Sequence, residues 1–199
     1  MRKITVINQK GGTGKTTTAV NLGAALAELG REVLLLDMDP QAGLTESLGV
    51  VTAGKPTVAE VLTRNAEPRE AFHKLAHLTV LPSSPGLAET EKRILRERPS
   101  DYPLALKEAL AGLRGFDFVV VDCPPSLGAL SLMGMFYSGS LLIPLQTHYM
   151  ALNGLEKVLG MVKTIREAGF PMAILGILPC MYDARTSLSR QVEERLRMT

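Results

Sequence analysis

One stretch near the N-terminus decides the fold: Lys10-Gly11-Gly12-Thr13-Gly14-Lys15-Thr16-Thr17. An apolar run at residues 4–7 comes before it, and a run with helical spacing at residues 17–29 follows it. A strand, a glycine-rich turn and a helix, in this order, form the context in which such a loop binds phosphate. The N–H groups of the loop and the positive end of the helix together make a site for an anion.

The residue types in the loop predict a nucleotide with Mg²⁺ as the cofactor, that is ATP or ADP. Lys15 supplies a charge for the β- and γ-phosphates, and Thr16 offers a hydroxyl to Mg²⁺. The predicted nucleotide-binding residues are Gly11, Gly12, Thr13, Gly14, Lys15, Thr16 and Thr17. The alternative is a glycine-rich turn with two solvated lysines, but the flanking strand and helix favour the phosphate site.

A second lysine distinguishes this loop from the general phosphate-binding fingerprint. The fingerprint requires a glycine where this chain has Gln9, and the chain has Lys10 at the start of the loop instead. The role of Lys10 therefore needs its own explanation.

The composition is that of an ordinary globular protein with 199 residues, 46% hydrophobic and 21% charged. No apolar run reaches the length of a membrane span, and the N-terminal apolar stretch is too short for a signal peptide. We expect a cytoplasmic protein without a membrane partner. The net charge of +2 does not indicate nucleic-acid binding by itself. Cys123 and Cys180 lack metal-ligand spacing, and we predict that both are buried, inert thiols.

Strands and helices are predicted to alternate along the chain, which is typical of a doubly wound, mostly parallel α/β sheet with helices on both faces. We predict a single domain over residues 1–199. The predicted strands are residues 2–8, 33–36, 78–81, 116–121, 140–144 and 172–178. The predicted helices are residues 16–30, 43–50, 57–63, 87–98, 102–113, 126–137, 150–168 and 186–198.

Three aspartates follow the ends of predicted strands and complete the site in this interpretation. Ligands of open α/β sheets bind beyond the carboxyl ends of strands, which places Asp37 and Asp39 near the loop if the first two strands are neighbours. Asp122 ends the strand downstream of the loop, where a carboxylate for Mg²⁺ is expected. Asp39 is the better candidate to orient an attacking water, and Asp37 is either a supporting carboxylate or a cap on the strand end. The predicted chemistry is phosphoryl transfer from a nucleotide to water.

The chain resembles the ParA-type ATPases over nearly its whole length. Residues 10–17 resemble the family's deviant Walker A loop, and Leu-Asp-Met-Asp-Pro-Gln at 36–41 resembles its second motif. Val-Val-Val-Asp-Cys-Pro-Pro-Ser at 119–126 resembles its Walker B motif. Ile-Pro-Leu-Gln at 143–146 and residues 151–155 and 181–186 resemble its later motifs, and the match favours the partitioning (Soj/ParA) branch.

This resemblance implies roles that spacing alone does not give. Lys10 matches the signature lysine, which reaches across an ATP-dependent homodimer to the partner's nucleotide. Asp39 matches the catalytic carboxylate, and Thr16 and Asp122 match the Mg²⁺ ligands, Asp122 directly or through water. The family binds DNA non-specifically, on the nucleoid, and a DNA-bound ParB-type partner stimulates its weak hydrolysis. Arg185 lies near surfaces that such proteins use for DNA, and Arg190 follows it on the last predicted helix.

Two departures from the family pattern leave alternatives open. His148 stands where the family usually has an acidic residue, and we assign it no role. The family continues beyond residue 199 with a strand, an adenine-contacting loop and further DNA-contacting residues. The alternatives are a Min-type membrane-cycling ATPase of cell-division site selection, an electron-transfer or metal-cluster ATPase, and a nucleotide-binding module without turnover.

Overall fold

The computed structural model describes residues 1–76, 78–147 and 151–186, and within them it contains a seven-stranded sheet. The strands lie in the order β3-β4-β2-β5-β1-β6-β7, and all neighbours are parallel except β3 and β4. The strands are β1 Arg2–Val6, β2 Val33–Asp37, β3 His73–Lys74, β4 Leu78–Leu81, β5 Phe118–Asp122, β6 Ser140–Gln146 and β7 Ala173–Cys180.

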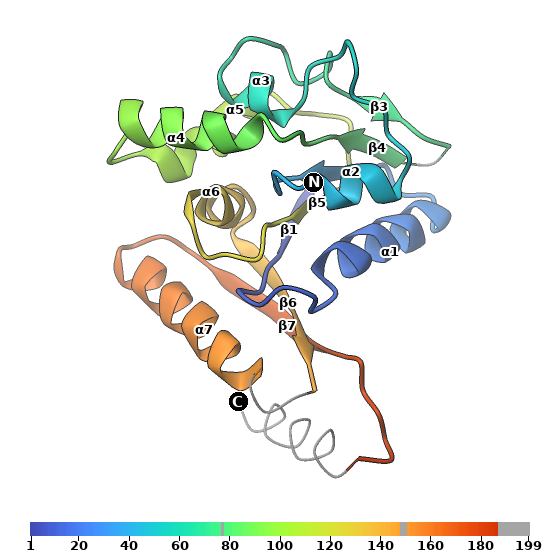
Figure 1. Cartoon of the computed structure of the whole chain (residues 1–199), viewed down its shortest axis with the longest axis vertical. Coiled ribbons are helices and arrows are strands. Elements are labelled where there is room, and N and C mark those ends of the chain that lie inside the picture. The colour runs from blue at the N-terminus through green and yellow to red at the C-terminus, as the bar shows by residue number, and fades with distance from the viewer. Residues whose placement is uncertain (77, 148–150, 187–199) are drawn as a thin grey trace.

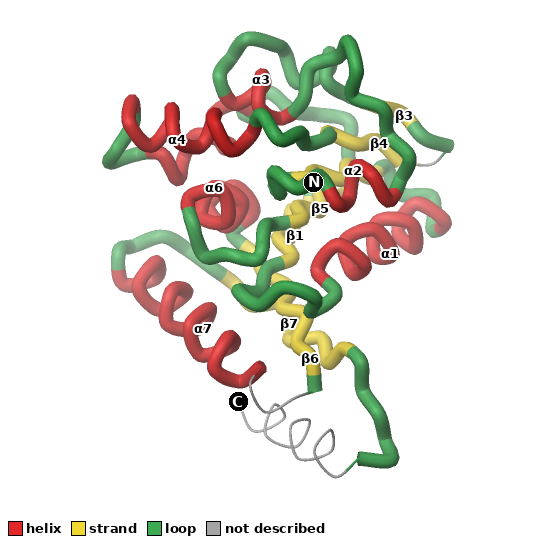
Figure 2. The backbone as a smooth tube through the Cα atoms, viewed as in Figure 1, coloured by secondary structure: helices red, strands yellow, loops and turns green. Residues whose placement is uncertain are grey.

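Helices cover both faces of this sheet (Figure 1). Helices α1 and α2 pack on one face, and α3 to α7 pack on the other. The helices are α1 Lys15–Glu28, α2 Gly43–Ser47, α3 Val58–Leu62, α4 Leu87–Glu97, α5 Ala105–Ala109, α6 Ala129–Ser138 and α7 Ala151–Glu167, with a 3-10 turn, η1, at Tyr102–Leu104. Figure 2 shows the resulting layers, with the strands between helices. The predicted doubly wound α/β fold is therefore confirmed.

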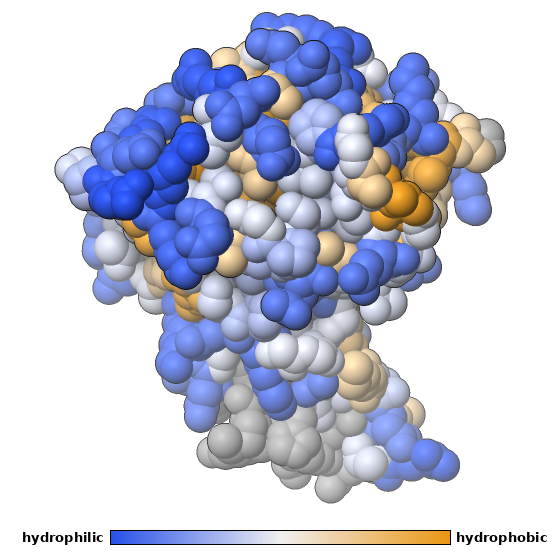
Figure 3. Space-filling view, turned by 45° about the horizontal axis from the view of Figure 1, so that its top comes forward, coloured by the Kyte–Doolittle hydropathy of each residue, from blue (hydrophilic) through white to orange (hydrophobic). Residues whose placement is uncertain are grey.

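The central strands are apolar on both faces because both are covered. In β2 every residue from Val33 to Asp37 is buried, and the side chains of Leu34 and Leu36 point to the opposite face from those of Val33 and Leu35. Such near-continuous apolar strands are typical of parallel sheets. Helix α4 shows the opposite pattern, since its charged side chains pair on the surface as Lys92–Glu89 and Arg93–Glu97. In Figure 3 hydrophilic side chains gather at the upper left, where α4 lies in Figure 1.

Several element boundaries differ from the sequence prediction. The predicted helix at 102–113 is observed as η1, with Pro103 in it, followed directly by the short α5, which ends at Ala109. The helix predicted from residue 126 begins at Ala129, after Gly128 in an extended conformation. Strand β3 was not predicted, because two residues are too few to show periodicity. The predicted helix at 186–198, with Arg190, lies outside the described residues except at its first position, and His148 lies outside them as well.

The strand order corrects the condition that the first two strands are neighbours, on which the predicted position of Asp37 and Asp39 depended. Strands β1 and β2 are not neighbours, because β5 lies between them and pairs with both. Parallel strands nevertheless bring their carboxyl ends to one edge of the sheet. This carboxyl edge carries the loop after β1, the aspartates after β2 and Asp122 at the end of β5.

Candidate functional site

The glycine-rich loop at residues 10–17 connects β1 to α1 and closes on itself through polar contacts. The amide of Lys10 donates to Asn8 Oδ1 at 3.1 Å, and the Thr13 hydroxyl donates to the Lys10 carbonyl at 3.3 Å. Gly12 and Gly14 have φ of 70° and 89°, a conformation that favours glycine, and Gly14 is the N-cap of α1. The loop is therefore shaped by its glycines and held by Asn8, which is itself buried and donates to the Pro144 carbonyl.

A cavity of about 300 Å³ opens at this loop. Its walls come from the loop, from the turn after β2, from the segment after β5 and from the residue after β7. The lining residues are Gly11, Gly12, Gly14, Lys15, Thr16, Thr17, Asp39, Pro125 and Met181. The structure thus brings six of the seven predicted nucleotide-binding residues and Asp39 around one cavity, whereas Thr13 is buried behind it.

Thr16 and Asp122 meet beside this cavity. The Thr16 hydroxyl donates to Asp122 Oδ2 at 2.6 Å, although the two residues are far apart in the sequence. Asp122 Oδ1 is buried and has no hydrogen-bond partner among the described residues. Burial raises the pKa of Asp122 to about 7, with Asp37 and Asp39 adding to the shift, while Thr16 and Lys15 oppose it. A buried carboxylate oxygen without a partner, next to a hydroxyl, fits a divalent cation with oxygen ligands.

The two aspartates after β2 differ in their surroundings. Asp37 is fully buried and accepts hydrogen bonds from the Asp39 amide at 3.0 Å and from the Thr45 amide and hydroxyl at 2.9 and 2.7 Å. Burial raises the pKa of Asp37, and these hydrogen bonds oppose the shift. Asp39 lines the cavity, and only its Oδ1 accepts a described hydrogen bond, from the Gln41 amide at 2.9 Å. Asp37 therefore ties the turn together, and Asp39 keeps one oxygen free at the cavity.

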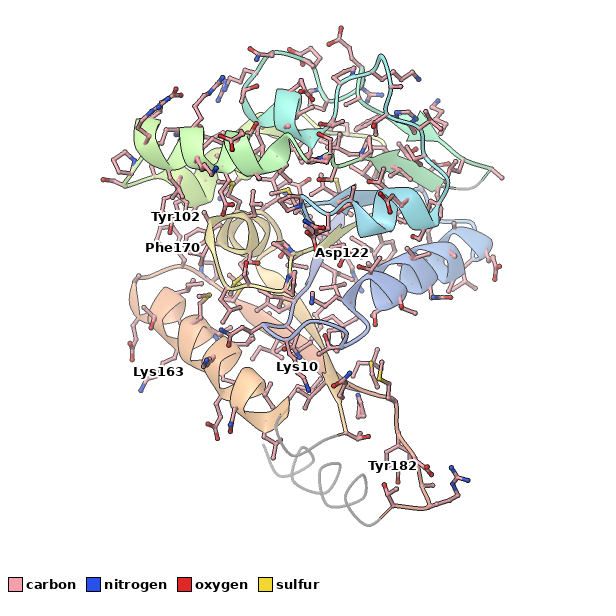
Figure 4. All side chains as sticks on the ribbon, viewed as in Figure 1. Lys10, Tyr102, Asp122, Lys163, Phe170 and Tyr182 are labelled. Atoms are coloured by element: carbon pink, nitrogen blue, oxygen red, sulfur yellow. The ribbon has the colours of Figure 1, made fainter. Side chains whose placement is uncertain are left out.

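The two lysines of the loop also differ. Lys15 is buried, and its ammonium donates to the Lys10 carbonyl at 3.1 Å. Burial lowers the pKa of Lys15, whereas the charges of Asp122 and Asp39 oppose that shift. Lys10 is exposed and does not line the cavity, and its ammonium donates to Gln146 Oε1 at 3.1 Å. Figure 4 labels Lys10 in the loop and Asp122 near the centre of the molecule.

Some contacts of the site were not assigned from the sequence. Gln146, at the end of β6, also donates to the Gly12 carbonyl at 2.8 Å. It therefore connects the Lys10 ammonium to the loop backbone at Gly12. Thr45 joins Asp37 to the Ser83 amide at 3.0 Å. The motif at residues 143–146 offered a signal for Gln146, whereas Thr45 lies in a short helix without a distinguishing pattern.

Other predicted residues lie apart from the cavity. Arg185 follows β7 and donates to both carboxylate oxygens of Asp183, at 2.8 Å for the shortest contact. Cys123 is buried as predicted, but the prediction was wrong for Cys180, which is half-buried and lies beside Gly14. Cys180 is accessible because β7 is an edge strand with one neighbour in the described sheet. No helix among the described residues is long and apolar enough to cross a membrane.

This fold and site define the chain as a P-loop nucleotide-binding protein. A family model described as "AAA domain" matches residues 1–172. The chain is 41% identical to the chromosome-partitioning ATPase Soj of Thermus thermophilus over 199 residues, which cover 99% of this chain and 76% of the relative. It is 38% identical to the chromosome partitioning protein ParA of Myxococcus xanthus over 201 residues, which cover 98% of this chain and 70% of the relative. The chain belongs to the ParA/Soj family of partitioning ATPases.

Solved structures share the same fold over the whole chain. A structure named cobyrinic acid a,c-diamide synthase from Mycobacterium smegmatis, with bound ADP and magnesium, is 42% identical with a TM-score of 0.91, covering 100% of this chain and 82% of that one. A complex of a Cyanothece McdA variant with ATP is 28% identical with a TM-score of 0.90, covering 100% of this chain and 78% of that one. The first of these names denotes an activity other than partitioning. The two solved structures have in common the fold and a bound adenine nucleotide.

Proposed function

We propose that this protein binds and hydrolyses ATP with Mg²⁺ and acts as a partition protein in chromosome or plasmid segregation. In this proposal residues 1–199 form one P-loop domain, ATP binding joins two copies into a dimer, and the dimer binds DNA non-specifically on the nucleoid. A DNA-bound ParB-type partner then stimulates hydrolysis. The proposal extends the family membership, and the chain's similarity to proteins solved with ADP, ATP and magnesium supports its choice of cofactor.

The surroundings of Thr16 and Asp122 support the Mg²⁺ part of the proposal. These two residues would hold the cation, because Asp122 Oδ1 is buried without a described partner and its other oxygen accepts the Thr16 hydroxyl. A bound Mg²⁺ would neutralise charge on the β- and γ-phosphates. Lys15, Gly11, Gly12, Gly14 and Thr17 would bind the phosphates from the cavity wall.

Asp39 is the residue that we propose to orient the attacking water. Its carboxylate lines the cavity, and one of its oxygens has no described hydrogen-bond partner, so it can accept a proton from a water molecule there. Asp37 is unsuited to this role because three hydrogen bonds and full burial occupy its carboxylate.

One observation carries the dimeric part of the proposal, namely the position of Lys10. Its ammonium is exposed, does not line the chain's own cavity, and is held at the edge of the loop by Gln146. A lysine that a second copy delivers to the nucleotide would neutralise charge in the transition state, as an arginine finger does in other enzymes.

The test is the oligomeric state of a Lys10→Ala variant with a non-hydrolysable ATP analogue and Mg²⁺, measured by light scattering after size exclusion. Wild type should form a dimer, whereas Lys10→Ala should stay a monomer with the analogue bound. Lys163→Ala is the matched control, because Lys163 is an exposed lysine on α7. An intact ATP-dependent dimer of Lys10→Ala would overturn the role of Lys10 in trans.

Whether the proposed dimer binds DNA or a membrane needs a separate measurement. Co-sedimentation with DNA and with liposomes, each with ATP, distinguishes the partition function from the Min-type alternative. Binding to DNA is the expected result, and binding to liposomes alone would favour membrane cycling. Variants of Arg185 and Arg190 test whether these two arginines contribute to DNA binding.

A further inference from the structure

A second cavity, of about 690 Å³, lies at the amino edge of the sheet, opposite the glycine-rich loop. We call it the amino-edge cavity. It is lined by residues from the starts of β1, β5, β6 and β7, from α5, from the end of α6 and from the segment between α7 and β7. In Figure 4, Phe170 of this cavity and Lys10 of the loop lie near opposite ends of α7. A volume of this size is typical of a small-molecule site.

Three cations line this cavity: Arg2, Lys3 and Lys107. No Asp or Glu lines it among the described residues, and none of the three cations forms an ion pair there. Burial lowers the pKa of Lys3, and the charges of Lys107 and Arg114 lower it further. The fold thus holds like charges together without an acidic partner, which is the arrangement that an anion would stabilise.

Aromatic side chains form the rest of the wall. Phe136 and Phe170 pack edge to face, with ring centroids 4.9 Å apart and an interplanar angle of 61°. The Lys3 ammonium lies 4.1 Å from the centroid of the Tyr137 ring, which fixes its position through a cation–π contact. Tyr137 also lines the cavity, and its hydroxyl is buried without a described hydrogen-bond partner.

We propose that the amino-edge cavity binds a small organic phosphate with a flat, apolar body. The body would lie against Phe136 and Phe170, and the phosphate would be bound by Lys3, Lys107 and Arg2. Arg2 and Lys107 are exposed, but Lys3 is half-buried beside the aromatic wall, which favours a small ligand that enters the cavity over the backbone of duplex DNA.

The probe for this site is 1-naphthyl phosphate, which combines a flat aromatic body with a phosphate. Its fluorescence anisotropy is followed with the full chain, with ADP and Mg²⁺ present in saturating amounts to occupy the loop site. Wild type should bind the probe saturably, inorganic phosphate should compete weakly, and 1-naphthol without the phosphate should bind poorly. Lys15→Ala should bind the probe as wild type does, which separates this site from the proposed ATP site.

The variants are Lys3→Met, which keeps the apolar stem, and Lys107→Gln, with Lys163→Met as the matched control outside the cavity. Loss of one charged hydrogen bond should weaken probe binding about tenfold in each of the first two variants and leave the control unchanged. Phe136→Leu should weaken it by a smaller factor. Circular dichroism of each variant confirms that it is folded.

Three results would overturn the proposal. The first is the absence of saturable probe binding by wild type. The second is equal binding by wild type, Lys3→Met and Lys107→Gln. The third is displacement of the probe by short duplex DNA together with loss of DNA binding in the same two variants, which would make this edge a nucleic-acid surface instead.

Discussion

The two edges of the sheet each hold a lysine whose pKa is lowered by burial, but the surroundings of the two lysines are opposite. At the carboxyl edge, Asp122 and Asp39 oppose the shift of Lys15. At the amino edge, Lys107 and Arg114 add to the shift of Lys3. The carboxyl edge therefore combines both signs of charge, as a site for phosphate and a cation requires, whereas the amino edge suits an anion alone.

The edges also differ in how polar groups are satisfied. At the carboxyl edge, backbone amides and hydroxyls donate to carboxylates, and Gln146 donates to the Gly12 carbonyl, so the loop and the turn after β2 are held in place. At the amino edge, the cations contact aromatic rings or solvent instead of carboxylates. A preorganised polar network favours catalysis, because its groups need no reorganisation during the reaction.

The largest expected effect is that of Asp39→Ala at the carboxyl edge. Loss of the carboxylate that faces the cavity should lower the rate of ATP hydrolysis by about 1,000-fold, because proton acceptance and water orientation are removed together. ATP affinity should stay close to that of wild type, so phosphate release and nucleotide binding are measured in parallel. Normal hydrolysis by this variant would show that another group orients the water.

The next effect compares the two lysines directly. Lys15→Ala should weaken ATP binding by about 100-fold or more, because a buried charge that contacts phosphate is lost. Lys3→Ala is the matched variant at the amino edge and should leave ATP affinity unchanged. Isothermal titration with ATP and Mg²⁺ measures both, and equal losses in the two variants would contradict the separation of the edges.

A smaller effect is expected on the free energy of unfolding, when an aspartate of the carboxyl edge is compared with one of the amino edge. Asp37→Ala removes three hydrogen bonds from a fully buried carboxylate, and relief of its burial offsets part of that loss. We expect a decrease of about 2 kcal/mol in the free energy of unfolding. Asp117→Ala, at the amino edge, removes one exposed contact with the Glu32 amide and should cost less than about 1 kcal/mol. Urea denaturation measures both, and similar costs would refute the contrast.

The smallest effect is a salt dependence at the amino edge. Added salt should screen the repulsion among Lys3, Lys107 and Arg114 and stabilise wild type slightly, by no more than about 0.5 kcal/mol for these partly exposed charges. Lys3→Met should gain less from the same salt increase. Urea midpoints of both proteins at low and high NaCl measure the difference, and an equal gain would mean that repulsion at Lys3 is negligible.

Much of the carboxyl edge could be predicted because its signals are local. The loop at residues 10–17, with a strand before it and a helix after it, defines a phosphate-binding turn through short-range backbone geometry. Aspartates at strand ends follow from the same pattern, and the structure does bring Asp39 to the loop cavity and Asp122 to Thr16. The short strand β3 and the division of the helix at 102–113 could not be predicted from periodicity.

The sequence by itself determined the alternation of strands and helices, the phosphate loop and the candidate acidic residues, because each depends on residues close together in the chain. The tertiary structure decided which of two aspartates faces the cavity, through the hydrogen bonds that Thr45 gives to Asp37. It also decided that β5 lies between β1 and β2, and that Lys3, Lys107 and Phe170 share one cavity. These features depend on strand order and on contacts between distant residues, which no local pattern encodes.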